Sequence, residues 1–410
     1  MKENNQSTLS RKMTLALINL LLATAMGAML RFAFVKELPW LDYRFWMNGH
    51  SHVAMLGWLY LALYILIIRL FLPEANRNSR FFDRLFRLTQ ASVAGMLIAF
   101  PLQGYAFWSI LFSTMHIFFS YAFVWKAWIL TRMDSTPEAG FLRTSLFFMV
   151  LSTMGLWTMG PIMAMELQGS AWYYGAVQFF LHFQFNGWFT FAVLALLFRT
   201  LRNQGVRLEE SSIRRFGMML TVASIPTYAL AVAWSNPHPA IFAVNSLGVL
   251  LQFAALILFV DLLRKTGSWQ LPTRVLWLFR IGLAGFLLKM LIQTAVVLPA
   301  IAKVAYTVRN YVIGFIHLIL LGTITFILFG VSDLYKIWPF ESRLSKFGLW
   351  LVVTGFLAME LVLFLQGTLF WANWGFLPRY YEVIFAVSAL VPAGVAIILA
   401  GRSKHSGISA

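Results

Sequence analysis

Apolar residues form long, nearly unbroken runs along this chain, separated by short polar segments. A helix needs about twenty apolar residues to cross the roughly 30 Å of hydrocarbon in a bilayer. Runs of that length recur from end to end, and no stretch is left over that would form a soluble domain. The pattern predicts an all-α, polytopic protein, a single membrane domain of about twelve helices over residues 13–34, 48–70, 88–106, 107–130, 143–164, 171–198, 214–234, 238–263, 276–300, 307–330, 346–368 and 380–400.

Composition agrees with a bilayer as the solvent, because 60% of the residues are hydrophobic and only 11% are charged. The first run, 13–34, is longer than the apolar core of a signal peptide, and no small-residue cleavage site separates it from the next run. We therefore expect it to be retained as the first transmembrane helix. The lipid bilayer is the partner that this composition predicts.

The net charge of +17 follows the bias of Lys and Arg toward cytoplasmic loops, so it does not indicate a nucleic-acid partner. With the N-terminus inside and twelve spans, all but seven of the 32 basic residues fall on the inner side. Lys289 lies within the ninth span, and the other six fall outside: Arg31, Lys36, Arg44, Lys303, Arg309 and Arg379. We expect an integral protein of a bacterial cytoplasmic membrane with both termini in the cytoplasm.

A histidine followed five residues later by a glycine occurs in the second, sixth and tenth predicted helices, four helices apart each time. The pairs are His52 and Gly57, His182 and Gly187, and His317 and Gly322. This spacing predicts three copies of a four-helix unit, over about 13–130, 143–263 and 276–400.

A second string supports the repeat. Leu102-Gln103-Gly104 with Phe107-Trp108 returns as Leu365-Gln366-Gly367 with Phe370-Trp371, at the same offset as the first and third histidines. Apolar helices rich in glycine and phenylalanine resemble one another by chance, but two unrelated strings with one offset favour a true repeat.

Five of the seven histidines lie within predicted spans, in the outer half or near the middle of the bilayer: His50, His52, His116, His182 and His317. A single intramembrane histidine is more often part of a helix-to-helix hydrogen bond than a ligand. A set at one depth favours ligation instead. His50 and His52 are about 200° apart around a helix, so they should point to nearly opposite sides.

The chemistry of these ligands narrows the choice of cofactor. Because the chain has no cysteine, it cannot form a disulfide, a c-type haem attachment, an iron–sulfur cluster or a thiolate copper centre. Imidazole suits iron, copper and zinc, and two imidazoles across a macrocycle make a bis-histidine haem site. The 39 Phe and 16 Trp would line a groove for such a flat apolar ligand.

Twelve helices in three repeats, with histidines on helices two and ten, resemble subunit I of the haem-copper oxidase superfamily (cytochrome c oxidase subunit I-like). The stretches that carry the resemblance are 311–322, around His317, and 48–58, around His52. The resemblance implies a pseudo-threefold bundle in which His52 and His317 are axial ligands of a low-spin haem. It also places His182 on the helix that supplies the first copper ligand.

The chain departs from that family at the copper site. Phe315 stands where the family's helix ten has the first member of His-x-His, and the seventh predicted helix has no histidine. Asn186 replaces the tyrosine four residues after the copper histidine. We expect the conventional copper centre to be missing. In a rearranged site, His50, His116 and His182 would hold a second haem or copper.

Other polar residues have two interpretations each. Arg31 and Arg309, at the outer ends of helices one and ten, would pair either with haem propionates or with lipid headgroups. Glu360 and Lys289 would form either a proton or ion path or a buried pair. For His116, a hydrogen bond within the bundle is the simpler alternative to metal ligation. We expect His238 to be solvated in an outer loop and His405 to lie in the tail.

Three functions remain open from the sequence. The first is a haem-binding redox protein that handles oxygen or nitric oxide and takes electrons from a quinol or a cytochrome. The second is a twelve-helix secondary transporter, although such proteins often show two six-helix halves and discontinuous helices, which the sequence does not predict here. The third is a scaffold of the same fold without a cofactor.

Overall fold

The computed structural model describes residues 2–233 and 238–402, and His405 lies outside them. The described residues form helices joined by short loops, with no strand among them, and they contain twelve helices long and apolar enough to cross a membrane, which confirms the all-α polytopic prediction. The elements are α1 (Lys2–Phe32), α2 (Tyr43–His52), η1 (Val53–Leu59), α3 (Tyr60–Phe71), α4 (Glu74–Arg77), α5 (Arg80–Gln103), α6 (Phe107–Thr131), α7 (Pro137–Trp157), α8 (Met159–Ala164), α9 (Ala171–His182), η2 (Phe183–Phe189), α10 (Thr190–Asn203), α11 (Glu210–Ser224), α12 (Tyr228–Ala233), α13 (Pro239–Lys265), α14 (Thr273–Ala295), α15 (Pro299–Thr307), α16 (Arg309–His317), η3 (Leu318–Thr325), α17 (Phe326–Leu334), α18 (Arg343–Trp371) and α19 (Tyr380–Ala400).

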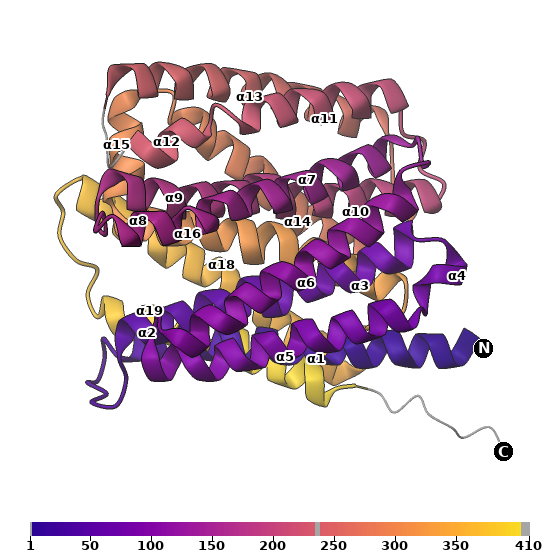
Figure 1. Cartoon of the computed structure of the whole chain (residues 1–410), viewed down its shortest axis with the longest axis horizontal. Coiled ribbons are helices and arrows are strands. Elements are labelled where there is room, and N and C mark those ends of the chain that lie inside the picture. The colour runs from indigo at the N-terminus through magenta and orange to yellow at the C-terminus, as the bar shows by residue number, and fades with distance from the viewer. Residues whose placement is uncertain (1, 234–237, 403–410) are drawn as a thin grey trace. The chain divides into compact units, whose positions relative to one another are not determined.

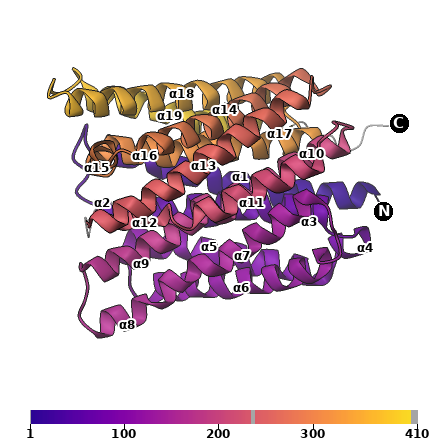
Figure 2. The same cartoon turned by 90° about the horizontal axis from the view of Figure 1, so that it is seen from above.

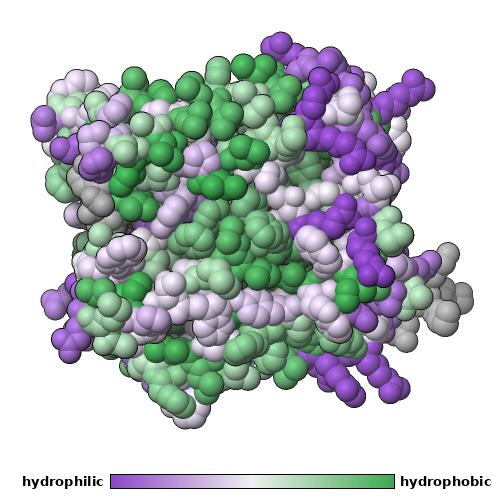
Figure 3. All heavy atoms as spheres, turned by 45° about the horizontal axis from the view of Figure 1, so that its top comes forward, coloured by the Kyte–Doolittle hydropathy of each residue, from purple (hydrophilic) through white to green (hydrophobic). Residues whose placement is uncertain are grey.

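The helices divide between two compact units, each described by itself below. Unit 1 is residues 1–65, 78–120 and 332–410, and unit 2 is residues 66–77 and 121–331. Figure 3 shows apolar side chains over much of one face and hydrophilic side chains gathered toward its edges, as expected of a protein that contacts lipid. The prediction of a single domain built from three repeats stays a prediction.

In unit 1, α18 and α19 lie side by side, as Figures 1 and 2 both show, and α1 packs against α19. Gly348 and Gly394 bring the α18 and α19 backbones together, because a Cβ on either would come within 2.5 Å of the other's carbonyl oxygen. Close approach of this kind is a main source of helix association in lipid, where burial of apolar surface gives no advantage.

In unit 2, α7 packs against α9 and η2, and α11 runs beside α13 (Figure 1). An ionic cluster joins the loop before α7 to the end of α10 and the start of α11. Glu138 is fully buried and lies 2.6 Å from Nε of Arg202, which also pairs with Glu210 at 3.1 Å. Arg199 pairs with Asp134. These bonds tie three consecutive spans together at one end.

Three π-helical segments are the feature that the sequence did not predict. Each begins directly after one of the repeat histidines, at Val53, Phe183 and Leu318, and each contains the repeat glycine. Each packs against the helix that precedes it by one span: η1 against α1, η2 against α7 and η3 against α14. Three copies of one unit would produce this match.

The glycines of these segments lie at close contacts, and in each predicted copy the helix one span earlier is among the neighbours. A Cβ on Gly57 would meet Asn19 of α1 at 3.0 Å, and one on Gly187 would meet Cβ of Phe148 in α7 at 2.5 Å. In the third copy the contact runs from Gly285 of α14 to the backbone of Gly322, at 3.1 Å. We therefore infer that these glycines serve close packing between the first and second helices of each predicted repeat.

The glutamines of the second repeated string also have matching roles. The Oε1 of Gln366 accepts from the N–H of Leu377, and its Nε2 donates to the carbonyl of Gly375. The amide of Gln103 lies against the N–H groups of Trp108 and Ser109. Each glutamine thus holds the connection that follows its own helix.

Several predicted spans are wrong in detail. The third begins earlier than 88, because Ser79 caps α5, and it ends at Gln103 because Gly104 takes a positive φ of 61°. The seventh, predicted as a continuous helix over 214–234, is broken between α11 and α12 around Pro226. The expectation that no helix is discontinuous is therefore wrong. A proline lacks the N–H that continues the helical ladder.

Other ends also shift. The fifth span is interrupted after Trp157, and α8 completes it. The ninth span ends at Ala295, short of the predicted 300, and a separate helix, α15, begins at Pro299.

Replacing Gly187 by Ala should destabilise the protein, because the new methyl group would overlap Phe148. Overpacking of a tight contact costs about 1–3 kcal/mol. The thermal unfolding midpoint in detergent measures the effect. Gly140→Ala in α7 is the matched control, since nothing lies within 4 Å of its added Cβ. Equal midpoints for the two variants would contradict the packing role.

Asp134 should make stability depend on pH. Its burial alone would raise the pKa, but hydrogen bonds from Thr136 and Arg199 outweigh burial and lower it. Ionised Asp134 therefore stabilises the folded protein at any pH above the ordinary aspartate pKa of about 4. That stabilisation is lost as the pH falls through the lower pKa of Asp134 in the folded protein. We expect Asp134→Asn to lower the unfolding midpoint at neutral pH. The difference from wild type should vanish in acid, and a constant difference would contradict this assignment.

Candidate functional site

The five intramembrane histidines divide between the two units. His50, His52 and His116 belong to unit 1, whereas His182 and His317 belong to unit 2. The facing of His52 and His317 across one pore therefore stays a prediction. What the structure does give is the orientation and the hydrogen-bond partners of each ring within its own unit.

His50 and His52 point to opposite sides of α2, as their spacing predicts. The ring of His50 faces α1, where its Nδ1 donates to the carbonyl of Ala23 at 2.7 Å. Gly27 provides room for it, since a Cβ there would lie 2.9 Å from the imidazole. The ring of His52 instead packs against Phe100 of α5, with the ring centres 4.1 Å apart.

His52 has the arrangement that metal-binding histidines usually show. Its Nδ1 donates to the carbonyl of Asn48, one turn earlier in α2, at 2.8 Å. This bond fixes the tautomer, so Nε2 carries the lone pair, and in the described part of the chain Nε2 has no hydrogen-bond partner. Phe100 and Tyr105 form an aromatic wall beside the ring.

His116 lies in the same region of unit 1. It is 2% exposed, stands edge-on to Tyr60 with ring centres 4.7 Å apart, and its Nδ1 lies 3.2 Å from Oγ of Ser120. This contact lies within α6, four residues along the same helix. Both interpretations of His116, a hydrogen bond to another helix and metal ligation, therefore stay predictions.

His182 is fully engaged by protein groups. A carbonyl oxygen can only accept, so the 2.8 Å contact with Ser224 means that Nε2–H of His182 donates. Nδ1 then accepts from the side chain of Asn186 at 3.3 Å. Both ring nitrogens are therefore used, and this part of the site does not fit a copper ion.

The break in the seventh span explains this bond. The helix ends at Ser224, and the N–H of Tyr228, which would have bonded Ser224 in a continuous helix, bonds Ile225 instead. A free carbonyl in hydrocarbon costs several kcal/mol, about the loss of a full hydrogen bond. The imidazole of His182 satisfies it.

A polar chain extends from His182 to α14. The side chain of Gln293 lies 3.5 Å from that of Asn186, and Lys289, one turn earlier in α14, is 2% exposed and acts on His182 through its charge. Its ammonium group also lies 5.8 Å from the ring centre of Phe286. Glu360, the other half of the predicted ion pair, belongs to unit 1, so that pairing stays a prediction.

The remaining predicted residues lie at helix ends. Arg31 is in the last turn of α1, and Arg309 and His317 are the first and last residues of α16. His238 is exposed, as predicted, and its Nδ1 accepts from the N–H of Ala240, which caps α13.

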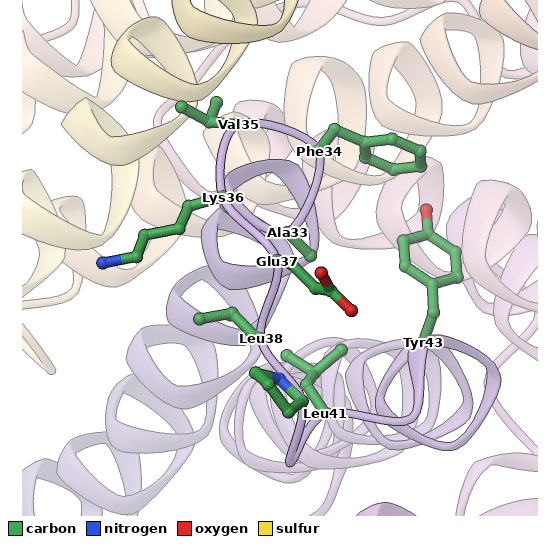
Figure 4. Close-up of a pocket in the computed structure, with 9 residues that line it drawn as sticks. Ala33, Phe34, Val35, Lys36, Glu37, Leu38, Leu41 and Tyr43 are labelled. Carbon is green, nitrogen blue, oxygen red and sulfur yellow. The ribbon is translucent and has the colours of Figure 1, made fainter.

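Unit 1 has a surface hollow whose lining residues are different from the candidate ligands. The loop after α1 lines it with residues 33–39, 41 and 43, and Figure 4 shows the carboxylate of Glu37 pointing inward while Lys36 points away. None of the candidate ligands belongs to this lining.

No protein-family model matches the chain, and no curated protein matches it. Within the described residues no three His, Cys, Asp or Glu side chains gather as a metal site. The resemblance to the oxidases therefore stays a prediction from the sequence.

Two irregular features could have been predicted from single residues in the sequence, although the predicted spans did not use them. Asn19, an amide inside the first apolar run, donates to the carbonyl of Gly57 at 3.0 Å. Pro226 inside the seventh run marks the broken helix. An isolated amide or proline in an apolar run indicates a backbone group that needs a partner.

His182→Ala should lower stability by about 1–3 kcal/mol, because the Ser224 carbonyl would lose its donor in an apolar setting. His182→Gln, whose amide is also a donor, should recover part of the loss. Detergent unfolding midpoints measure both, and metal content should not change. Loss of a bound metal in the Ala variant, with stability intact, would overturn the structural role and restore His182 as a ligand.

Proposed function

We propose that this chain is a haem-binding membrane redox protein, related in fold to subunit I of the haem-copper oxidases. It handles a small gas, oxygen or nitric oxide, and its copper centre is absent or non-standard. The observation that carries the proposal is the environment of His52, whose ring is oriented by a backbone carbonyl and presents a free Nε2 beside aromatic side chains.

The surroundings of His52 fit a haem. A donated Nδ1 hydrogen bond raises the basicity of Nε2 and holds the ring in one plane. His317, its predicted counterpart, ends α16 in the same way that His52 ends α2, directly before a π-helical segment. Arg31 and Arg309 are the predicted partners of the propionates.

The copper site of the oxidases does not fit these residues. The two nitrogens of His182 are engaged, Asn186 supports it, and α11 and α12 contain no histidine. A protein of this kind would bind the gas or transfer electrons at haem iron alone. His50, with Nδ1 bonded to Ala23, is the predicted ligand for a second haem.

When bound, the haem would supply a one-electron redox centre, filled by a quinol or a cytochrome. The chain's own residues hold the ligand ring in position, exclude water with aromatic walls and satisfy the helix backbones around the site. The proposed setting is a bacterial cytoplasmic membrane with both termini inside, as the distribution of basic residues favours.

A transporter is the second candidate, because the break between α11 and α12 is a feature of transporter folds. In transporters the freed backbone groups bind substrate or ion. Here His182 occupies the Ser224 carbonyl. A cofactor-free scaffold is the third candidate.

The purified full-length protein should show a low-spin haem spectrum, with haem recovered on extraction. His52→Ala and His317→Ala should each abolish that spectrum and leave membrane insertion intact, because each removes an axial ligand. His238→Ala is the control, since His238 is exposed and only caps α13. Colourless protein from haem-replete cells would exclude the haem proposal, and a substrate-dependent flux in vesicles would then favour a transporter. Stoichiometric copper on metal analysis would overturn the absence of a copper centre.

A further inference from the structure

Glu360 is a carboxyl group buried in a transmembrane helix without a hydrogen-bond partner. It is 8% exposed, it lies within α18, and neither Oε1 nor Oε2 accepts or donates a hydrogen bond. Nothing in the proposed haem site uses it. An ionised carboxylate left in this condition is strongly disfavoured, so the group holds a proton for as long as no positive charge acts on it.

One positive charge does act on it. Arg31, in the last turn of α1, exerts an electrostatic effect on Glu360, and it acts on His50 of α2 as well. The three residues come from three helices of unit 1. The guanidinium favours the anionic form of Glu360 without forming a hydrogen bond to it, so both protonation states have physical support.

Ionisable side chains are absent from long stretches of the helices around Glu360. From Phe347 to Trp371, α18 has no other ionisable side chain, and α19, which packs along it, has none between Val383 and Ala400. In α1, which packs against α19, none occurs from Met13 to Leu30. Charged residues stand at both ends of these helices, but Arg31 is the one whose charge acts on Glu360. We therefore take polar access to run toward the membrane face on which α1 ends and residues 33–42 connect it to α2.

We propose that Glu360 is a proton-exchange site inside the membrane, in contact with the face on which α1 ends and poised by the charge of Arg31. The site takes up and releases a proton without a metal or a haem. It shares Arg31 with the proposed haem site, but Glu360 itself is no part of that site, so the proposal can be tested whether the chain proves to be a redox protein or a transporter.

Dicyclohexylcarbodiimide tests this proposal, because it enters apolar regions and reacts with protonated carboxyl groups. The carboxyl O–H adds across the carbodiimide, and the acyl group then moves to nitrogen, which leaves a stable acylurea. Mass spectrometry of the full-length protein after digestion reports the labelled fraction of Glu360 as the pH is raised. Glu360→Gln should remove the label, and Glu382→Gln, which changes an exposed acid at the start of α19, should leave it unchanged.

We expect labelling of Glu360 in the wild type that falls at least severalfold as the pH is raised. In Arg31→Gln the label should persist to higher pH, because the anion loses its supporting charge. Arg31→Lys keeps the charge and should restore the wild-type profile, which separates the effect from misfolding. In oriented vesicles, alkali added only to the face carrying residues 33–42 should suppress the label.

Three results would overturn the proposal. Labelling that does not change with pH would show a carboxyl group locked in its protonated form. Identical profiles for wild type and Arg31→Gln would remove Arg31 from the site. Suppression by alkali on the opposite face alone would reverse the direction of access.

Discussion

The structure depends on one constraint, which is that a backbone carbonyl or N–H inside hydrocarbon must have a partner. Regular helices meet it automatically, and several of the irregular segments in the described residues meet it with a side chain. In the π-helical segments or directly after them, the hydroxyl groups of Thr190, Thr323 and Thr325 donate to carbonyls five residues earlier. Asn19 serves Gly57, and His182 serves Ser224. These polar residues inside the membrane are therefore found where the helices depart from regular geometry.

This constraint separates the histidines by role. A ring with both nitrogens bonded to protein, as in His182, completes the fold and has no lone pair left for a metal. A ring fixed through Nδ1 alone, as in His52, keeps a directed Nε2 for an axial bond. Under the proposed function, His52 would therefore serve as a haem ligand, whereas His182, at the predicted copper position, makes structural hydrogen bonds. Glu360 differs from both histidines, because neither of its carboxyl oxygens has a hydrogen-bond partner.

The three π-helical segments link packing to the site. Each widens a helix directly after a histidine, at a glycine that lets the preceding helix approach. A wider turn changes the direction in which the following side chains point and frees carbonyls for other donors. The histidine and its neighbouring helix are therefore positioned by the same local irregularity. The match among three segments so far apart in the chain supports a common origin by repetition.

The sequence by itself determined the class of protein, the number of spans and the opposite directions of His50 and His52. It could do so because the length of an apolar run and the angle between neighbouring side chains are local properties. It missed the π-helical segments, the break at Pro226 and the two bonds of His182. These depend on which helix lies opposite, and therefore on contacts between residues such as His182 and Ser224 that are far apart in the chain. Only the tertiary structure decided which polar groups meet. Each polar group in hydrocarbon needs a partner, but the local sequence does not show which distant residue that partner is.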